Sequence, residues 1–118
     1  MGASLAKLLI TRMLELTDEA QQELRKVDSY NFDIFKLREL TDRHELSTLL
    51  PYVLAKHGLI GGCQLDITNL MNFVRALEAG YKDITYHNQT HAADVCQTFN
   101  YFVTEGGMKD KLKMDNLE

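Results

Sequence analysis

Apolar residues recur at intervals of three and four along most of the chain, which is the spacing of one face of an α-helix. The first stripe continues past a weak break at Thr17-Asp18 and consists of Leu5, Leu8, Leu9, Met13, Leu16, Ala20, Leu24 and Val27. It predicts one long or two short amphipathic helices in residues 1–30. This helical lead-in either packs on a neighbouring core or forms the seam of a homodimer, because about three heptads can also form a coiled coil.

A short helix and then a longer one are predicted after this lead-in. The apolar run at residues 32–37 follows a cluster of turn formers and should be a brief helix packed inward. Asp42 and Glu45 stand three residues apart and resemble a capping box. Pro51 is tolerated only near the first turn of a helix, so the longer helix should begin near Ser47.

Glycines end this longer helix, and a further apolar stripe follows them. Gly58 and residues 61–62 predict a loop, after which Asp66 should cap the next helix. The apolar face of that helix comprises Ile67, Leu70, Met71, Val74 and Leu77. His44 and His57 flank the preceding helix and are interpreted as solvated end residues, and His57 also suits the negative end of a helix dipole.

The last long helix carries two histidines, and Gly106-Gly107 should end it. Its expected buried side is formed by Val95, Phe99 and Phe102, which share one helical face. The residues after Met108 begin another helical pattern. Because every periodic stretch is helical, the predicted fold class is all-α.

Composition limits the size and the partners of the protein. With 118 residues, 45% of them apolar, the chain can bury one core, so it is one domain or part of one. The net charge of -4 without a basic stripe argues against binding to nucleic acid. No apolar run approaches the roughly 18 residues of a membrane span. Cys63 and Cys96 fit no zinc or disulfide spacing, so reduced thiols are expected. The expected location is the cytoplasm, or the cytosolic face of a membrane if flanking segments carry spans.

The segment Tyr86-His87-Asn88-Gln89-Thr90-His91-Ala92-Ala93-Asp94-Val95 carries most of the candidate chemistry. A step of four residues places His87 and His91 one above the other on a helix, with Asp94 a turn further on. Two such imidazoles can bind one metal, or one can bind metal while the other donates a proton, or both can be structural. Asn88 stands where a zinc protease needs an acid, and no deaminase signature or phosphate loop occurs.

This segment resembles the Y-H-N-x-x-H-A-x-D-V signature of the class I cyclic-nucleotide phosphodiesterases, with every fixed position present. The run at 32–37 and the two helices after it also follow in the order seen at the start of that catalytic domain. The resemblance implies that residues 31–118 are the N-terminal helices of a multi-helix phosphodiesterase catalytic domain of the HD type, truncated at the C-terminus.

The resemblance also implies a role for each residue of the signature. His87 matches the general acid that protonates the leaving 3′ oxygen, and His91 matches a zinc ligand. Tyr86 matches a residue of the substrate pocket. Asn88 and Asp94 match supporting positions that would hydrogen-bond an imidazole or the helix start. The implied reaction is hydrolysis of cyclic AMP, cyclic GMP or both to the 5′-monophosphate, with zinc and magnesium (or manganese) as cofactors.

The chain departs from the family after the signature. The family supplies further metal ligands from a His-Asp pair and a later Asp, whereas no histidine follows His91 here. We therefore expect the remaining ligands to lie beyond residue 118. One imidazole cannot make a zinc site of three or four ligands, so the isolated chain should be inactive and without tight metal binding. It should also be marginally stable or prone to aggregation.

Two alternatives remain open on the sequence. The chain could be an inactive helical interaction module that retains the signature, with the stripe from Leu5 to Val27 as its partner surface. It could also be a pH or metal sensor based on His87 and His91 without hydrolysis.

Overall fold

The computed structural model describes residues 10, 12–81 and 88–112, and within those residues it contains helices and no strand. The predicted all-α class is therefore confirmed. The helices, in chain order, are α2 (Asp18–Leu24), α3 (Ile34–Leu40), α4 (Glu45–Lys56), α5 (Leu59–Gly62), α6 (Ile67–Ala79), α7 (Gln89–Thr104) and α8 (Met108–Lys111).

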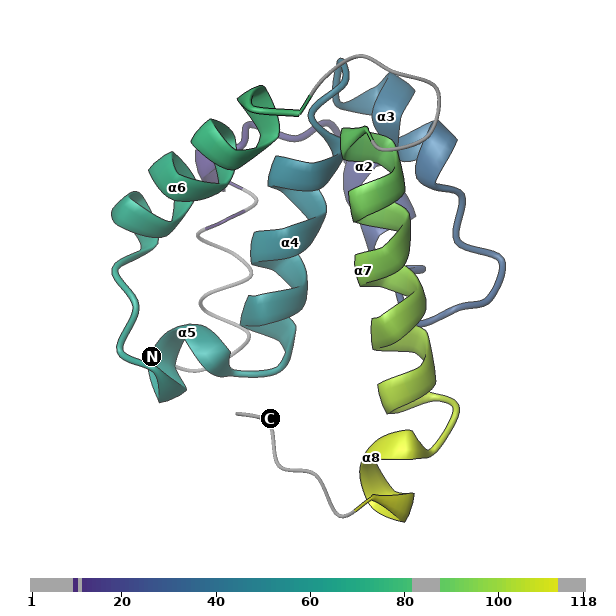
Figure 1. Ribbon diagram of the computed structural model, residues 1–118. Coiled ribbons are helices and arrows are strands. Elements are labelled where there is room, and N and C mark those ends of the chain that lie inside the picture. Colours follow the sequence, from purple (N-terminus) through teal and green to yellow (C-terminus); the bar gives the residue numbers. More distant parts are fainter. Residues whose placement is uncertain (1–9, 11, 82–87, 113–118) are drawn as a thin grey trace.

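Helix α4 is the centre of the packing, with α6 on one side and α7 on the other (Figure 1). Helix α3 contacts the first part of α7, and α2 contacts α3. One apolar cluster, between α4 and α2, α3 and α7, contains Leu24, Val27, Ile34, Leu37, Leu46, Leu49, Tyr52, Val53 and Ala93. The second cluster, between α4 and α6, contains Ile10, Ala55, Ile60, Met71 and Val74. Because α4 contributes to both clusters, it is buried on most of its circumference.

Side-chain caps begin α2, α3 and α6. Thr17 accepts a hydrogen bond from the Ala20 amide, so the predicted break at Thr17-Asp18 is the start of α2. Asp66 accepts from the Asn69 amide at 2.9 Å and caps α6, as the sequence predicted. Asp33 caps α3 in the same way. Such caps satisfy amides that have no partner inside the helix, so short local patterns set these starts.

The predicted start of α4 is wrong. The helix begins at Glu45 rather than near Ser47, and Pro51 is its seventh residue. Asp42 forms no capping box, because the N-cap residue is His44, and Asp42 lies two residues before it with a left-handed φ of 52°. The cap comes instead from α6, since Glu78 Oε2 accepts from the Ser47 amide at 2.8 Å. The amide at the start of α4 is therefore satisfied by a carboxylate 31 residues away, and not by Asp42 as the sequence pattern indicated.

The expected buried face of α7 is also wrong. Val95, Phe99 and Phe102 are 53%, 57% and 47% exposed. The buried side of the helix is instead the row Thr90, Ala93, Gln97 and Asn100. This face is mostly polar, and its side chains reach backbone and side-chain partners on neighbouring segments, for instance Gln97 Nε2 to the Val27 carbonyl at 2.9 Å. Hydrogen bonds of this kind offset the cost of burying polar groups.

The two histidines that flank α4 are not simple solvated ends. His57 Nε2 donates to Asn100 Oδ1 at 2.7 Å and so joins the end of α4 to α7. His44 Nδ1 donates to Glu78 Oε1, also at 2.7 Å, although the His44 side chain is 63% exposed. The expectation that His57 stands near the C-terminus of α4 is confirmed, since it is the C-cap residue.

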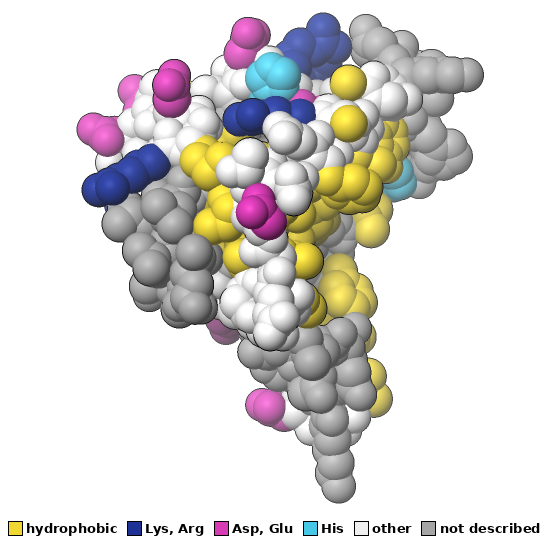
Figure 2. Space-filling view, turned by 90° about the vertical axis from the view of Figure 1, so that its left-hand side faces the viewer, with side chains coloured by type: hydrophobic (Ala, Val, Ile, Leu, Met, Phe, Trp, Pro, Cys, Tyr) yellow, Lys and Arg dark blue, Asp and Glu magenta, His cyan; other side chains and the backbone are white. Residues whose placement is uncertain are grey.

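Apolar side chains are also exposed outside α7. Figure 2 shows hydrophobic side chains gathered across the face on the α6 side of the molecule, and Phe73 and Leu77 of α6 are 62% and 39% exposed. Among the described residues, no helix has both the length and the apolar character needed to cross a membrane. The start of the Leu5 to Val27 stripe, with its possible dimer seam, lies outside the described residues.

A polar network lies where α4, α7 and the segment after α2 meet. Asp28 Oδ1 accepts from Lys56 Nζ and from Asn100 Nδ2, both at 2.8 Å. Burial raises the pKa of the Asp28 carboxyl, but the hydrogen bonds from Lys56 and Asn100 and the charges of Lys56 and His57 outweigh burial. The pKa of Asp28 is therefore below its ordinary value, and the charged form is favoured in the folded state.

This network predicts a loss of stability in acid. Because the folded pKa of Asp28 is depressed, its contribution is present above about pH 4 and is lost as the pH falls from there through the folded pKa. The side chain is 36% exposed, so the contribution should stay below about 1 kcal/mol. Urea unfolding of the Asp28→Asn variant should show a destabilisation at pH 7 that shrinks below pH 4. Asp110→Asn, at an exposed position on α8, is the control, and a pH-independent deficit in Asp28→Asn would refute this account.

Candidate functional site

The described part of the histidine segment, residues 88–95, forms the N-cap and about the first two turns of α7. Asn88 is the N-cap residue, and its Oδ1 accepts from the His91 amide at 2.9 Å. His91 follows as the third helical residue and is partly buried, while Asp94, one turn further on, is exposed. Tyr86 and His87 lie outside the described residues. The structure therefore places the candidate metal ligand and both supporting residues, but not the candidate acid.

A cavity of about 230 Å³ lies beside this turn, between α3 and α7. Its lining residues are Ile34, Phe35, Arg38, Asn88, Thr90, His91 and Asp94. An imidazole, a carboxylate, an amide and a guanidinium therefore face one small space, which suits recognition of a polar or anionic group. The three predicted residues in this lining, Asn88, His91 and Asp94, come from one helix, as their spacing requires.

The metal chemistry of the site is incomplete in the described part of the chain. A zinc site needs three or four nitrogen, sulfur or oxygen ligands, and His91 is one suitable donor. No group of three His, Cys, Asp or Glu side chains that could hold a metal occurs among residues 10, 12–81 and 88–112. These residues alone do not fit a metal centre. Cys96 is not among the residues that line this cavity, and burial raises the pKa of its thiol to about 11.

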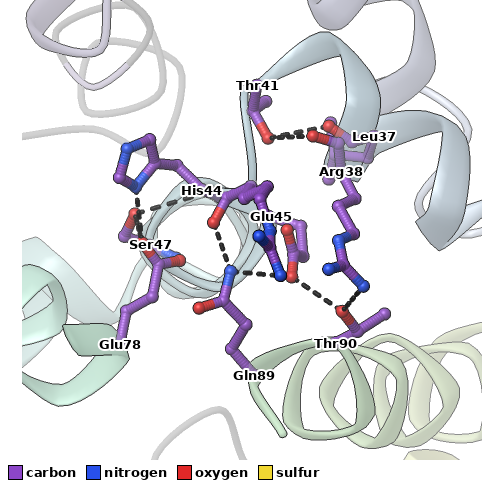
Figure 3. Close-up of polar contacts among 10 residues, drawn as sticks. Leu37, Arg38, Thr41, His44, Glu45, Ser47, Glu78, Gln89 and Thr90 are labelled. Atoms are coloured by element: carbon purple, nitrogen blue, oxygen red, sulfur yellow. Dashed lines mark hydrogen bonds and ion pairs between the residues drawn. The ribbon is translucent and has the colours of Figure 1, made fainter. Parts of the chain in front are cut away.

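Two other helices hold the first turn of α7 in place (Figure 3). Glu45 of α4 accepts hydrogen bonds from Gln89 and Thr90, the two residues before His91. Arg38 of α3 donates to the Thr90 hydroxyl at 3.1 Å. Sequence reasoning missed both contacts, because Arg38 and Glu45 are more than forty residues from Thr90 and the pattern around Glu45 indicated a capping box with Asp42 instead.

A larger cavity, of about 580 Å³, lies on the other side of the start of α4. His44, Glu78, Arg43 and Arg75 are among its lining residues, and His91 is not. Carboxylates of Glu15 and Asp42 also line it, and Glu78 is already bonded to Ser47 and His44. We therefore take the smaller cavity, which contains the residues of the histidine segment, as the candidate site.

The signature at the start of α7 and the helical fold define a class of protein, and comparison with known sequences supports it. The chain belongs to the class I cyclic-nucleotide phosphodiesterases and corresponds to a segment of their catalytic domain. It is 42% identical over 87 residues to the dual specificity calcium/calmodulin-dependent 3′,5′-cyclic nucleotide phosphodiesterase 1B of Bos taurus. It is 38% identical over 93 residues to the 1C enzyme of Homo sapiens.

These matches cover 72% and 77% of the chain but only 16% and 13% of the two relatives. The chain therefore spans a small part of the length of the curated relatives that it matches. No family model matches the chain. Membership of the family rests on the long pairwise similarity and on the signature together.

Proposed function

We propose that this chain is part of an enzyme that hydrolyses 3′,5′-cyclic nucleotides, cyclic AMP, cyclic GMP or both, to the 5′-monophosphates. The observation that carries the proposal is the 42% identity over 87 residues to a cyclic-nucleotide phosphodiesterase, in a chain that holds every fixed position of the family signature. The cavity beside Asn88, His91 and Asp94 supports it, because these residues offer a ligand and hydrogen-bonding groups in one place.

In this proposal the residues of the signature divide the chemistry. His87 donates a proton to the leaving 3′ oxygen, which a group that titrates near neutral pH does efficiently. The His91 imidazole binds a metal, and Tyr86 lies beside the substrate. Asn88 holds the helix start that carries His91, and Asp94 adds a polar group to the same cavity.

Zinc together with magnesium or manganese would polarise the phosphoester and lower the pKa of a bound water. His91 is the ligand that this chain contributes, and a neutral imidazole is a common zinc donor. No histidine follows His91 in the 118 residues, so we propose that the other ligands come from outside this sequence. Alone, the chain should bind zinc weakly.

We also propose a cytoplasmic location for the enzyme. Cys63 and Cys96 are thiols that form no disulfide, which suits a reducing compartment.

The experiment compares the isolated chain with a chimera in which it replaces the matching segment of the bovine 1B enzyme. The isolated chain should show neither stoichiometric zinc binding by calorimetry nor hydrolysis of cyclic AMP or cyclic GMP, because it holds too few ligands. The chimera should hydrolyse at least one of the two nucleotides, because it restores the missing ligands.

The outcomes separate two statements. Turnover or tight zinc binding by the isolated chain would overturn the claim that the site is completed elsewhere. A folded chimera that binds metal like the bovine enzyme but hydrolyses neither nucleotide would overturn the proposed function and would favour an inactive interaction module.

A further inference from the structure

A buried carboxylate links three helices at the start of α7 (Figure 3). Glu45 is completely buried. Its Oε1 atom accepts from Thr90 Oγ1 at 2.9 Å and from Gln89 Nε2 at 3.0 Å. Thr90 Oγ1 in turn accepts from Arg38 Nη1 at 3.1 Å. Helices α3, α4 and α7 therefore meet in one chain of hydrogen bonds, from a guanidinium through a hydroxyl to a carboxylate.

The second oxygen of this carboxylate makes its burial unfavourable for the stability of the fold. Glu45 Oε2 is buried and has no hydrogen-bond partner among the described residues. A buried charge is expensive unless its lone pairs are satisfied, and apolar residues often pack such a position with no loss of stability. Packing alone therefore does not account for Glu45, and the contacts of its bonded oxygen are the feature to explain.

Those contacts are made to the two residues that precede His91. Gln89 and Thr90 are the first two helical residues of α7, and Asn88 caps the same turn through the His91 amide. Gln89 Nε2 also donates to the Arg43 carbonyl, which lies in the left-handed turn before α4. Successive residues of a helix point about 100° apart, so the rotation of this turn about the helix axis sets the direction of the His91 side chain. Contacts from outside the helix fix that rotation, whereas the Asn88 cap, which belongs to the same turn, does not.

We propose that Glu45 is a positioning residue, which fixes the rotation of the first turn of α7 and so the direction of the His91 imidazole. This inference rests on the proposed function, in which His91 is a metal ligand. Metal sites and substrate sites need their groups held to within about half an ångström, and such precision comes from supporting hydrogen bonds. Glu45 supplies that support from α4, whereas Asn88 belongs to the turn that it caps.

The test uses the monomeric fraction of the 118-residue chain and measures His91 directly by NMR. Three-bond couplings report the χ1 rotamer of His91, and amide exchange reports the first turn of α7. Glu45→Ala should average the His91 couplings and speed exchange of the Ala92 and Ala93 amides about tenfold relative to the end of α7. Glu45→Gln keeps the accepting oxygen and removes the charge, so it should restore both values.

Two further variants keep the test decisive. Thr90→Val removes the hydroxyl at similar volume, and it should reproduce the Glu45→Ala couplings if Glu45→Ala does not fold. Ser47→Ala is the matched control, because it breaks a hydrogen bond from α4 to Glu78 without touching α7. Unchanged His91 couplings in Glu45→Ala or, where that variant does not fold, in Thr90→Val would overturn the proposal, as would equal changes in Ser47→Ala. A failure of the proposed function would appear only in the hydrolysis assay of the chimera.

Discussion

Replacing His91 with alanine in the chimera should abolish hydrolysis and release zinc together. A metal ligand should cost no less than the outer hydrogen-bonding partners of metal sites, whose loss costs roughly 10- to 100-fold. We therefore expect kcat/KM to fall by at least about 100-fold and the zinc content measured by elemental analysis to fall in proportion. His44→Ala is the matched control, because His44 lines the other cavity, and it should leave zinc content near that of the unmodified chimera.

His87→Ala should behave differently. A general acid contributes about 10²- to 10⁴-fold to a rate without binding the metal, so kcat should fall while zinc content is retained. The pH dependence of kcat should also lose the limb that reports the acid. Equal zinc loss in the His87 and His91 variants would refute this division of roles, and full activity in His91→Ala would refute the metal-ligand role itself.

Replacing Asn100 with alanine should destabilise the isolated chain far more than replacing its neighbour Phe99. Asn100 is 2% exposed, accepts from His57, and donates to Asp28 and to the Val27 carbonyl. Its removal takes the partner from His57 Nε2 and breaks the hydrogen bonds to Asp28 and to the Val27 carbonyl, which keep Lys56 and Gln97 as donors. A hydrogen bond of this kind contributes about 0.5 to 1.5 kcal/mol. We expect about 2 to 4 kcal/mol in total. Phe99→Ala should cost less than about 1 kcal/mol, because Phe99 is 57% exposed.

Urea unfolding of the monomeric fraction at neutral pH gives both free energies. The hydrophobic pattern alone predicts the reverse order, since it assigns Phe99 to the buried face and has no role for Asn100. Asn100→Asp would be a poor control because it adds a charge, so Thr98→Ala, at an exposed position on the same helix, serves instead. A larger loss in Phe99→Ala than in Asn100→Ala would contradict the packing described here.

The helices were predictable where a local rule applies. The caps at Thr17 and Asp66 satisfy amides within their own first turn, so neighbouring residues were enough to place them. The start of α4 was not predictable, because its cap is Glu78, and Glu45 bonds to α7 rather than to its own turn. The spacing of Asp42 and Glu45 is that of a capping box whether Glu45 bonds to its own turn or, as here, to α7.

The candidate site shows the same division. The spacing of Asn88, His91 and Asp94 indicated that they share a helix, and all three line one cavity. Arg38 completes that lining from α3, and Glu45 holds the turn from α4, yet neither belongs to a pattern around the histidines. Helical spacing identifies residues that share a face of one helix. It does not indicate which other helix packs against that face, so contacts such as those of Arg38 and Glu45 could not be predicted.

The sequence by itself determined that the chain is helical, where most helices lie, and which residues carry the family signature. These properties depend on hydrogen bonds within one turn and on residue identity. The tertiary structure alone decided which face of α7 is buried. An amphipathic pattern shows that an apolar face exists, but not whether this chain covers it. Here a polar row is buried instead, because α4 and the segment after α2 offer partners for Thr90, Gln97 and Asn100.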